Sequence, residues 1–323
     1  MELVPRKRLE LFSGRAHPEL AREVADHLQV KLGELTLREF SDGEIYSRFD
    51  QSVRGKDIFL LQSHAGPVND SIFEQLIMVD AAKRASAKRI TAVCPYYGYS
   101  RQDRKASGRE PITAKLVADL FKAAGADRII SVDLHSGQIQ GFFDGPVDHL
   151  TATQVLTDYL RAQDASDLVI VAPDAGRVKV AERYAQKLQA GLAVVHKSRP
   201  KGMANVVNAL NVVGDVAAKR CVIVDDMIDT AGTVTAAADL LLSRGASDVW
   251  VMATHPILSG PAIKRLTDSS ISRVIVTNTL PLSGDRLTDK IEVVSIAKVI
   301  ADAIAAVFED GSVSELFHGD NLS

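Results

Sequence analysis

The chain has 323 residues, a typical length for two domains of roughly 150 residues each. Its net charge of −3 argues against a general nucleic-acid or anionic-membrane binder, because such proteins are usually basic. No apolar run approaches the roughly 18 residues of a membrane span, and residues 1–14 lack the apolar segment of a secretory signal. We therefore expect a cytoplasmic globular protein that binds neither nucleic acid nor membrane.

Helix-like and strand-like segments alternate along the chain. A helix-like segment that ends in a small-residue turn and is followed by a β-branched strand recurs at 78–95, 115–135 and 237–255. Gly125 and Gly245 stand where helices often end with a glycine in the left-handed conformation. Such short apolar strands between helices predict an α/β fold with largely parallel sheets. The expected strands are Ile58–Leu61, Ile129–Val132, Val169–Ala172, Leu192–His196, Cys221–Val224, Val249–Met252 and Val274–Thr277.

The two halves of the chain resemble each other faintly. "IISVDLHSG" (129–137) and "VIVDDMIDTAG" (222–232) each contain a strand, an aspartate and a polar turn. This duplication predicts two similar domains, each a mainly parallel sheet flanked by helices. We expect the domains at 1–150 and 151–306, with the tail 307–323 packing back on the first of them.

An acidic stretch follows one of the expected strands. "VDDMIDTAGT" (224–233) places Asp225, Asp226 and Asp229 within five residues, directly after the apolar run 221–224. Carboxylates this close repel one another, so we expect a cation or a hydroxyl-rich ligand beside them. The alternative is an Asp-capped turn before a helix, which needs one aspartate and not three.

The second half of this stretch suits a phosphate group. A helix begins after it, and the first amides of a helix lack intrahelical partners and lie at the positive end of the dipole. Ala231 and Gly232 allow a phosphate to approach the backbone, and the hydroxyls of Thr230 and Thr233 can donate to it. The upstream aspartates would then face a sugar diol or a bound Mg²⁺. The chain has no GxxxxGK[ST] loop and no GxGxxG after a strand, and these residues alone leave the phosphate site and the structural turn both open.

The same stretch resembles the phosphoribosyl-diphosphate-binding motif of the type I phosphoribosyltransferase fold. From about residue 9 to Phe317, further motifs are similar to those of class I ribose-phosphate diphosphokinases, also called phosphoribosyl-diphosphate synthetases. These motifs are "FSDGEI" (40–45), "SVRG" (52–55), "YSRQDRK" (99–105), "REPITAKLVADL" (109–120), "VDLHSGQIQGFFDGPVDHL" (132–150), "APDAGRVK" (172–179), "HKSRP" (196–200) and "THPILSGPA" (254–262).

The resemblance implies an enzyme of nucleotide, histidine and tryptophan biosynthesis. Such enzymes transfer the diphosphoryl group of ATP to the 1-hydroxyl of ribose 5-phosphate, giving 5-phosphoribosyl 1-diphosphate and AMP. They are Mg²⁺-dependent and assemble from dimers into homohexamers.

Family resemblance assigns catalysis to Lys197 and Arg199, on a loop that closes over the reacting phosphates. Two cations there would offset the charge on the transferring group. His196 and Ser198 stand where many relatives have Asp and Arg, but the Lys and Arg themselves are kept. We find no residue to name as a general base.

The family's ligand sites can be carried over position by position. The implied Mg²⁺ ligands are His135 and Asp174. The implied ATP residues are Phe40, Asp42, Gly43 and Glu44, which reach in from a neighbouring subunit, and Arg101, Gln102 and Asp103. The implied ribose 5-phosphate residues are Arg199, Asp225, Asp226, Asp229, Thr230, Ala231, Gly232 and Thr233.

Regulation by ADP and phosphate at a subunit interface is also implied. Gly108 stands where relatives commonly have a serine that contacts the allosteric anion, so one hydroxyl donor is lost. We therefore expect regulation with an altered phosphate or ADP response. The implied effector residues are Ser52, Arg54, Ser312, Ser314 and Phe317.

Two other functions are weighed against the synthetase. A transferase that consumes phosphoribosyl diphosphate would share 225–233, but it has no reason to keep Lys197 and Arg199 together with His135 and the loop of Arg101. A silent regulatory homologue usually has a disrupted catalytic loop, whereas the loop is short and intact here.

Overall fold

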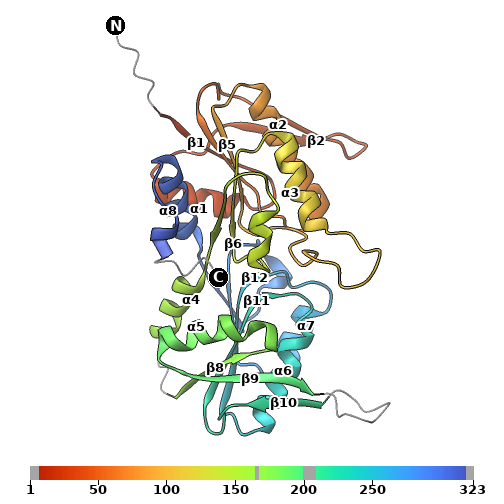
Figure 1. Ribbon diagram of the computed structural model, residues 1–323, viewed down its shortest axis with the longest axis vertical. Coiled ribbons are helices and arrows are strands. Elements are labelled where there is room, and N and C mark those ends of the chain that lie inside the picture. The colour runs from red at the N-terminus through yellow and green to blue at the C-terminus, as the bar shows by residue number, and fades with distance from the viewer. Residues whose placement is uncertain (1–6, 164–166, 199–208, 318–323) are drawn as a thin grey trace. The chain divides into compact units, whose positions relative to one another are not determined.

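The computed structural model describes residues 7–163, 167–198 and 209–317. These residues form two compact units. Unit 1 contains the residues up to Thr151, the segment Thr279–Pro281 and the residues from Ile296 onward, and unit 2 contains Ala152–Asn278 and Leu282–Ser295. In both units parallel strands alternate with helices (Figure 1), so the expected α/β fold is confirmed.

Unit 1 is built on a five-stranded parallel sheet in the order β1-β4-β5-β6-β7. Its strands are β1 (Leu9–Ser13), β4 (Asp57–Leu61), β5 (Arg89–Cys94), β6 (Arg128–Val132) and β7 (Val147–Leu150). Its helices are α1 (Pro18–Leu28), α2 (Val68–Arg84), α3 (Thr113–Ala124) and α8 (Ala297–Phe308), with short 3₁₀ turns η1 (Gly137–Gly141) and η4 (Ser314–Phe317).

Helices cover both faces of this sheet. α2 and α3 pack together on one face, over alternate strand residues such as Ile58, Leu60 and Ala92. α1 packs against α8 and β1 on the other side (Figure 1). Because both faces are covered, every residue of β4 is buried, which explains the continuous apolar run Ile58–Leu61 after Asp57.

A two-stranded hairpin stands apart from this sheet. β2 (Leu35–Glu39) and β3 (Ile45–Phe49) pair in antiparallel register. Gly43, with φ of +92°, provides the left-handed residue that the turn needs, and its amide donates to the Phe40 carbonyl at 2.9 Å. The hairpin therefore carries the "FSDGE" motif at its tip.

Unit 2 is built on a seven-stranded sheet in the order β10-β9-β8-β11-β12-β13-β14, parallel except for β10. Its strands are β8 (Leu168–Ala172), β9 (Gly191–Ser198), β10 (Ala209–Val213), β11 (Arg220–Ile228), β12 (Asp248–Pro256), β13 (Arg273–Thr277) and β14 (Ile291–Val294). Its helices are α4 (Thr153–Arg161), α5 (Val178–Leu188), α6 (Gly232–Ser243) and α7 (Ala262–Asp268), with 3₁₀ turns η2 (Ala175–Arg177) and η3 (Gly284–Arg286).

The α6 helix buries the face that its sequence indicates. Val234, Ala237, Ala238 and Leu241 are buried in one cluster with alternate residues of the central strands. This packing fixes the start of α6 at Gly232, close to the end of β11. Strand β11 is longer than expected: it continues to Ile228, because Asp225 still pairs with Ala253 of β12.

The division between the units differs from the expected one at residues 296–306, which contain most of α8 and belong to unit 1. Ion pairs of Arg89 on β5 attach the segment after α8 to the unit 1 sheet. Its guanidinium contacts Asp57 of β4 and Asp310, which follows α8, at 2.6 Å each. Thr279 also belongs to unit 1, since its carbonyl accepts a hydrogen bond from Ser63.

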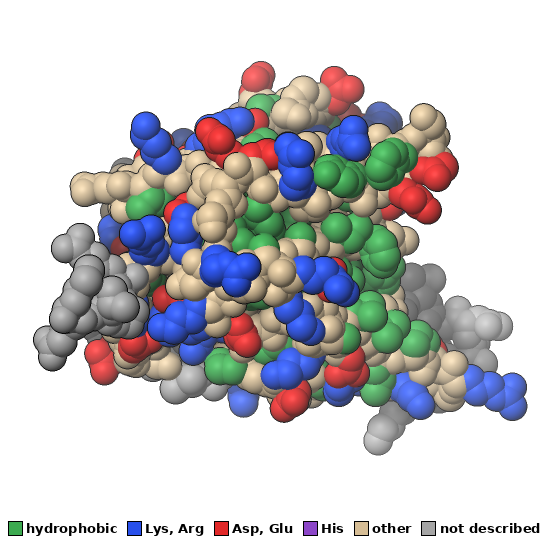
Figure 2. Space-filling view, turned by 90° about the horizontal axis from the view of Figure 1, so that it is seen from above, with side chains coloured by type: hydrophobic (Ala, Val, Ile, Leu, Met, Phe, Trp, Pro, Cys, Tyr) green, Lys and Arg blue, Asp and Glu red, His purple; other side chains and the backbone are tan. Residues whose placement is uncertain are grey.

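Basic and acidic side chains are interspersed on the face shown in Figure 2, and hydrophobic side chains gather on part of it. Exposed hydrophobic residues of unit 1 include Phe73 on α2, 61% exposed, and Leu116 and Leu120 on α3. Among the described helices, none combines the length and the apolar character needed to cross a membrane.

Candidate functional site

The acidic pair at the end of β11 is held by an arginine. The Nε atom of Arg177 lies 3.0 Å from Oδ1 of Asp225, and its Nη2 atom lies 2.6 Å from Oδ2 of Asp226. Oδ1 of Asp225 also accepts a hydrogen bond of 2.8 Å from the Asp226 amide. Part of the cation expected beside the carboxylates is therefore supplied by the protein itself.

Burial makes this pair costly to ionise fully. Burial, and after it the neighbouring Asp226 carboxylate, raise the pKa of Asp225 to about 8, against the lowering effect of Arg177. One guanidinium balances only one of the two negative charges, so a proton is retained near neutral pH. A hydroxyl-rich ligand would find both hydrogen-bond acceptors and a titratable group here.

The loop after β11 is shaped by backbone contacts. Ser259 donates to the Asp229 side chain, and its amide donates to the Asp229 carbonyl at 3.0 Å. Ala231 adopts a left-handed conformation, with φ of +62°, immediately before α6. Arg265 of α7 donates from Nη1 to the Thr230 carbonyl at 2.9 Å. These contacts hold 229–231 in a turn that presents the first amides of α6.

Asp174 closes the turn after β8, the strand next to β11. Its Oδ1 atom accepts hydrogen bonds from the amides of Gly176 at 2.8 Å and Arg177 at 3.2 Å. Both strands end at the same edge of the parallel sheet, where ligands of α/β folds bind. Asp174 and the acidic pair are thus brought to one end of the unit 2 sheet.

The expected catalytic segment begins in β9. Lys197 lies near the end of this strand, paired with Leu210 of β10. Arg199 lies outside the described residues. Because β9 and β8 are parallel neighbours, Lys197 lies at the same edge of the sheet as Asp174.

In unit 1, Arg101 and Gln102 line a pocket of about 410 Å³. Tyr96 and Tyr99 also line it, and the Tyr99 hydroxyl donates to Asn69. Aromatic and amide groups beside an exposed arginine suit a flat base joined to phosphates. The structure therefore gives the expected ATP loop a pocket within unit 1.

Asp103 faces inward instead of into this pocket. It is 7% exposed, and its Oδ2 atom accepts hydrogen bonds from Ser136 Oγ at 2.5 Å and Gln138 Nε2 at 2.8 Å. These donors directly follow His135. Asp103 consequently joins the Arg101 loop to the His135 loop.

Two buried histidines accept hydrogen bonds from the backbone next to the Arg101 loop and the His135 loop. The Nδ1 atom of His64 accepts a hydrogen bond of 2.8 Å from the Gly98 amide, just before the Arg101 loop. The Nε2 atom of His149 accepts one of 2.9 Å from the Leu134 amide, next to His135. Burial lowers the pKa of His64 to about 4, so its ring is neutral and keeps the acceptor.

The hairpin residues are exposed. Phe40 is 45% exposed, and Arg38 lies over its ring at 5.2 Å. Oδ1 of Asp42 accepts a hydrogen bond of 3.1 Å from the Glu44 amide, which stabilises the turn. Gly43 completes the tip. An exposed aromatic ring at the tip of a hairpin is available to a neighbouring molecule.

The expected effector residues lie in two segments of unit 1. Ser52 and Arg54 are exposed in the loop before β4, and Ser312 is exposed before η4, which contains Ser314 and the buried Phe317. The ion pairs of Arg89 join the start of β4 to the chain just before this second segment. The structure thus places both segments at the same end of the unit 1 sheet.

The two expected Mg²⁺ ligands each follow a strand. His135 follows β6 and Asp174 follows β8, and they belong to different units. Within residues 7–163, 167–198 and 209–317, no group of three or more His, Cys, Asp or Glu is arranged to hold a metal. A single carboxylate such as that of Asp174 suits Mg²⁺, which keeps several waters and takes phosphate oxygens.

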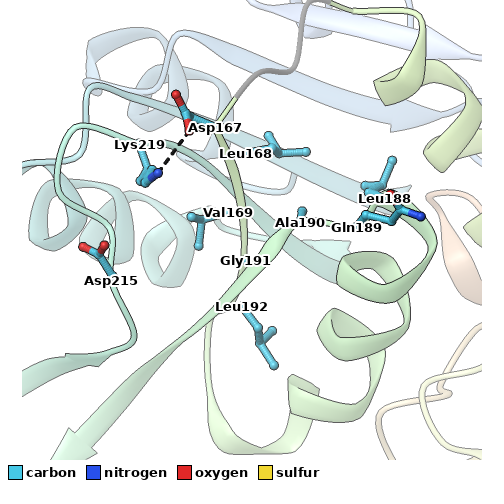
Figure 3. A pocket seen from close by; sticks show the side chains of 10 residues that line it. All are labelled: Asp167, Leu168, Val169, Leu188, Gln189, Ala190, Gly191, Leu192, Asp215 and Lys219. Atoms are coloured by element: carbon cyan, nitrogen blue, oxygen red, sulfur yellow. Dashed lines mark hydrogen bonds and ion pairs between the residues drawn. The ribbon is translucent and has the colours of Figure 1, made fainter.

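Unit 2 contains a pocket of about 530 Å³ at the amino ends of its parallel strands, the edge opposite to Asp174 (Figure 3). It is lined by Leu168 and Gly191 at the starts of β8 and β9, and by the pair Lys219–Asp167, whose atoms are 3.1 Å apart. Because ligands of parallel α/β sheets bind at the carboxyl ends of strands, this pocket is not the expected site.

Sequence reasoning missed Arg177, Arg265, His64 and His149. Each acts through a tertiary contact with a segment distant in the sequence, which periodicity does not reveal. The "AGRVK" segment did contain one signal, since a cation directly after the Asp174 turn would lie next to the strand that carries the acidic pair.

Comparison with known proteins identifies the class. Residues 9–125 match the family model described as the N-terminal domain of ribose phosphate pyrophosphokinase, and residues 197–318 match the phosphoribosyl synthetase-associated domain. Together with the α/β fold, these matches define a transferase of the phosphoribosyl synthetase class.

Full-length relatives narrow the identification. The chain is 58% identical over 312 residues to a ribose-phosphate pyrophosphokinase of Streptomyces avermitilis, covering 96% of each chain. It is 55% identical over 321 residues to the enzyme of that name from Bifidobacterium longum, covering 98% of this chain and 94% of the relative. It also matches the crystal structure of phosphoribosylpyrophosphate synthetase from Mycobacterium smegmatis with a TM-score of 0.89 and 55% identity, covering 94% of this chain and 100% of that chain. The chain belongs to the ribose-phosphate pyrophosphokinase family, the family indicated by its motifs, and is an enzyme of nucleotide biosynthesis.

Proposed function

We propose that this enzyme transfers the diphosphoryl group of ATP to the 1-hydroxyl of ribose 5-phosphate, releasing AMP. The observation that carries this proposal is the last part of β11, where an acidic pair lies one short turn before the start of helix α6. The first amides of α6, with Thr230 and Thr233, bind the 5-phosphate. Asp225 and Asp226 accept hydrogen bonds from the sugar hydroxyls.

ATP binds at the pocket of unit 1. Arg101 faces its phosphates, Gln102 lies nearer its base, and Asp103 holds their loop against the turn after His135. Thr113 Oγ1 already contacts Gln102 Oε1 at 2.5 Å, which orients the amide. The base stacks on Phe40 of a neighbouring copy, while Asp42 and Glu44 accept hydrogen bonds from the base or the ribose.

Catalysis relies on positioning and on neutralising charge, as in other phosphoryl transfers. Lys197 and Arg199 bind the transferring group and stabilise its developing charge. His135 and Asp174 are the residues that would hold Mg²⁺, and the bound ion would screen and polarise the phosphate oxygens. Asp174 is pre-oriented by the two amides that it accepts from, so its carboxylate needs little reorganisation.

The first experiment follows the products. Purified protein is given ATP, Mg²⁺ and ribose 5-phosphate, and AMP and phosphoribosyl diphosphate are measured together. We expect equal amounts of both, with loss of both in Lys197→Ala. Lys219→Ala, at the opposite edge of the sheet, is the matched control and should keep full turnover. ADP in place of AMP would mean a simple kinase, and no turnover with retained ribose 5-phosphate binding would favour a silent subunit.

We propose that the protein acts as a homohexamer, in the cytoplasm, with each hairpin completing a neighbour's ATP site. The exposure of Phe40 supports this proposal. Light scattering measures the assembly. Mixing inactive Phe40→Ala and Lys197→Ala subunits tests the sharing, because some sites of a mixed assembly receive an intact copy of each residue. Regained activity is expected, and its absence in demonstrated mixed assemblies would contradict sharing.

ADP and phosphate act at the segments of Ser52, Arg54 and Ser312 to Phe317, with a response altered by Gly108. A side chain added at Gly108 would meet no atom within 4 Å, so serine fits there. We expect Gly108→Ser to strengthen the response to phosphate while leaving basal turnover unchanged. Regulation is refuted if phosphate has no effect on either protein and ATP fully competes away the inhibition by ADP.

A further inference from the structure

Arg177 connects the turn of Asp174 to the acidic pair on the neighbouring strand β11. It ends η2, precedes α5, and its amide donates to Asp174. Its side chain is only 15% exposed and reaches across to the neighbouring strand β11, where it contacts both Asp225 and Asp226. Arg177 lies within the motif at 172–179, but the resemblance assigned no role to it.

The geometry uses the fork of a guanidinium. Nε contacts one carboxylate and Nη2 the other, so the two side chains of adjacent residues are fixed relative to each other. A lysine has a single ammonium group in place of this fork and would hold the pair less well. The amide of Asp226 adds a second constraint on Asp225.

The charges also require this contact. Asp225 and Asp226 are 16% and 8% exposed, so two unbalanced carboxylates would repel each other with little help from water. Arg177 offsets the charge of one carboxylate. Without it, a second proton would bind or the two carboxyl groups would turn away from each other.

We propose that Arg177 is a positioning residue for ribose 5-phosphate: it orients Asp225 and Asp226 together so that they accept hydrogen bonds from the sugar's vicinal hydroxyls. This inference rests on the proposed function of the acidic pair. A purely structural ion pair would instead affect stability and both substrates alike.

The test uses three variants of the full-length enzyme. Arg177→Met removes the cation and keeps much of the side-chain length, Arg177→Lys keeps the charge and loses the fork, and Lys179→Met removes an exposed charge from the same helix. The Kd of ribose 5-phosphate is measured by calorimetry without ATP. KM for each substrate, kcat and the melting temperature are measured in parallel.

We expect Arg177→Met to raise the Kd and KM of ribose 5-phosphate at least tenfold, and KM for ATP less than twofold. Arg177→Lys should recover part of the loss, and Lys179→Met should resemble the wild type. Equal increases in both KM values, or an unchanged Kd for ribose 5-phosphate, would overturn the inference.

The wild-type measurement separates the two levels of the argument. If the wild-type enzyme neither binds ribose 5-phosphate nor makes phosphoribosyl diphosphate, the proposed function itself fails. If it does both and the variants bind the sugar phosphate normally, only the role of Arg177 fails. Should Arg177→Met not fold, Arg177→Lys decides through the same comparison of the two KM values.

Discussion

Replacing His64 by leucine removes a buried acceptor while keeping roughly the same volume. In the wild type, Nε2 of His64 contacts Oε1 of Gln75 at 2.9 Å, and Nδ1 accepts from the Gly98 amide. Because Nδ1 accepts, the proton is on Nε2, which donates to Gln75. Leucine would leave the buried Gly98 amide without its partner, whereas Gln75 would keep a contact of 3.3 Å with the Cys94 thiol.

The cost follows from these contacts. One buried unsatisfied amide costs about 1–3 kcal/mol, and the weakened Gln75 contact adds about 1 kcal/mol. We therefore expect the free energy of unfolding of unit 1 to fall by about 2–4 kcal/mol at pH 7.5. At about 2–4 °C per kcal/mol for a unit of this size, the melting temperature falls by roughly 5–15 °C.

Lowering the pH should narrow the difference in stability between the wild type and His64→Leu. The pKa of His64 lies at about 4 in the folded protein against 6.5 for the ordinary group, so the unfolded chain binds more protons between these values. The contribution of the neutral ring is present above pH 6.5 and is lost as pH falls through about 4. By pH 4.5 the wild type loses roughly 2 kcal/mol or more of this contribution, and His64→Leu does not.

Urea unfolding followed by circular dichroism at pH 7.5 and 4.5, at one protein concentration, measures both effects. Hydrogen exchange of the peptide containing Gly98 locates them. His27→Leu, at an exposed position of α1, is the control and should change neither. A stability difference that stays constant or widens at pH 4.5 would show that the ring is not the neutral acceptor seen here.

Three further predictions concern the two substrate sites. The pKa of Asp225 is raised to about 8, so its proton stabilises the fold at low pH and dissociates as pH rises through 8. The ionised carboxylate accepts hydrogen bonds from the sugar, so ribose 5-phosphate should bind more tightly at pH 9 than at pH 7 in calorimetry. Asp225→Asn should show no such change. Gly232→Ala should change the melting temperature little, because the nearest atom to the added methyl is the flexible end of Arg265 at 3.3 Å and Thr230 Oγ1 lies at 3.9 Å. It should raise KM for ribose 5-phosphate severalfold, because the methyl occupies the space proposed for the phosphate. Asp103→Ala should raise KM for ATP and destabilise unit 1 by about 2–4 kcal/mol in urea, because Ser136 and Gln138 lose a shared charged acceptor.

Each of these predictions has a contrary outcome. Binding that is independent of pH in the wild type would refute the role given to Asp225. An unchanged KM in Gly232→Ala would move the phosphate away from the start of α6. A change in KM for ribose 5-phosphate alone in Asp103→Ala would separate this residue from the ATP loop.

The central strands were predictable because they are buried on both faces. Each expected strand lies in a strand of the structure, since runs such as Cys221–Val224 have no polar alternative to a doubly covered sheet. The strands not predicted are shorter or carry weaker signals. β14 ("IEVV") and β7 ("VDHL") have four residues each, lie at sheet edges and carry a charged residue at their second position, so their apolar runs are too short to stand out.

The candidate site was predictable only where one segment contains the chemistry. The stretch 225–233 combines carboxylates, small residues and a helix start in a single run, so its function can be inferred locally. The end of β11 could not be inferred, because the pairing of Asp225 with Ala253 depends on a strand 28 residues away. Arg177 was missed for the same reason, since its partners lie on the next strand of the sheet.

The packing of α8 in unit 1 determines the order in which the two units can fold during synthesis. Unit 2 is encoded between Ala152 and Ser295, so its whole sequence has been synthesised before α8 leaves the ribosome. Unit 1 begins first but cannot cover its α1 face until residues 297–308 are available. During synthesis the complete sequence of unit 2 is therefore available before that of unit 1, and the unit that contains the expected ATP pocket is closed by a helix encoded after unit 2.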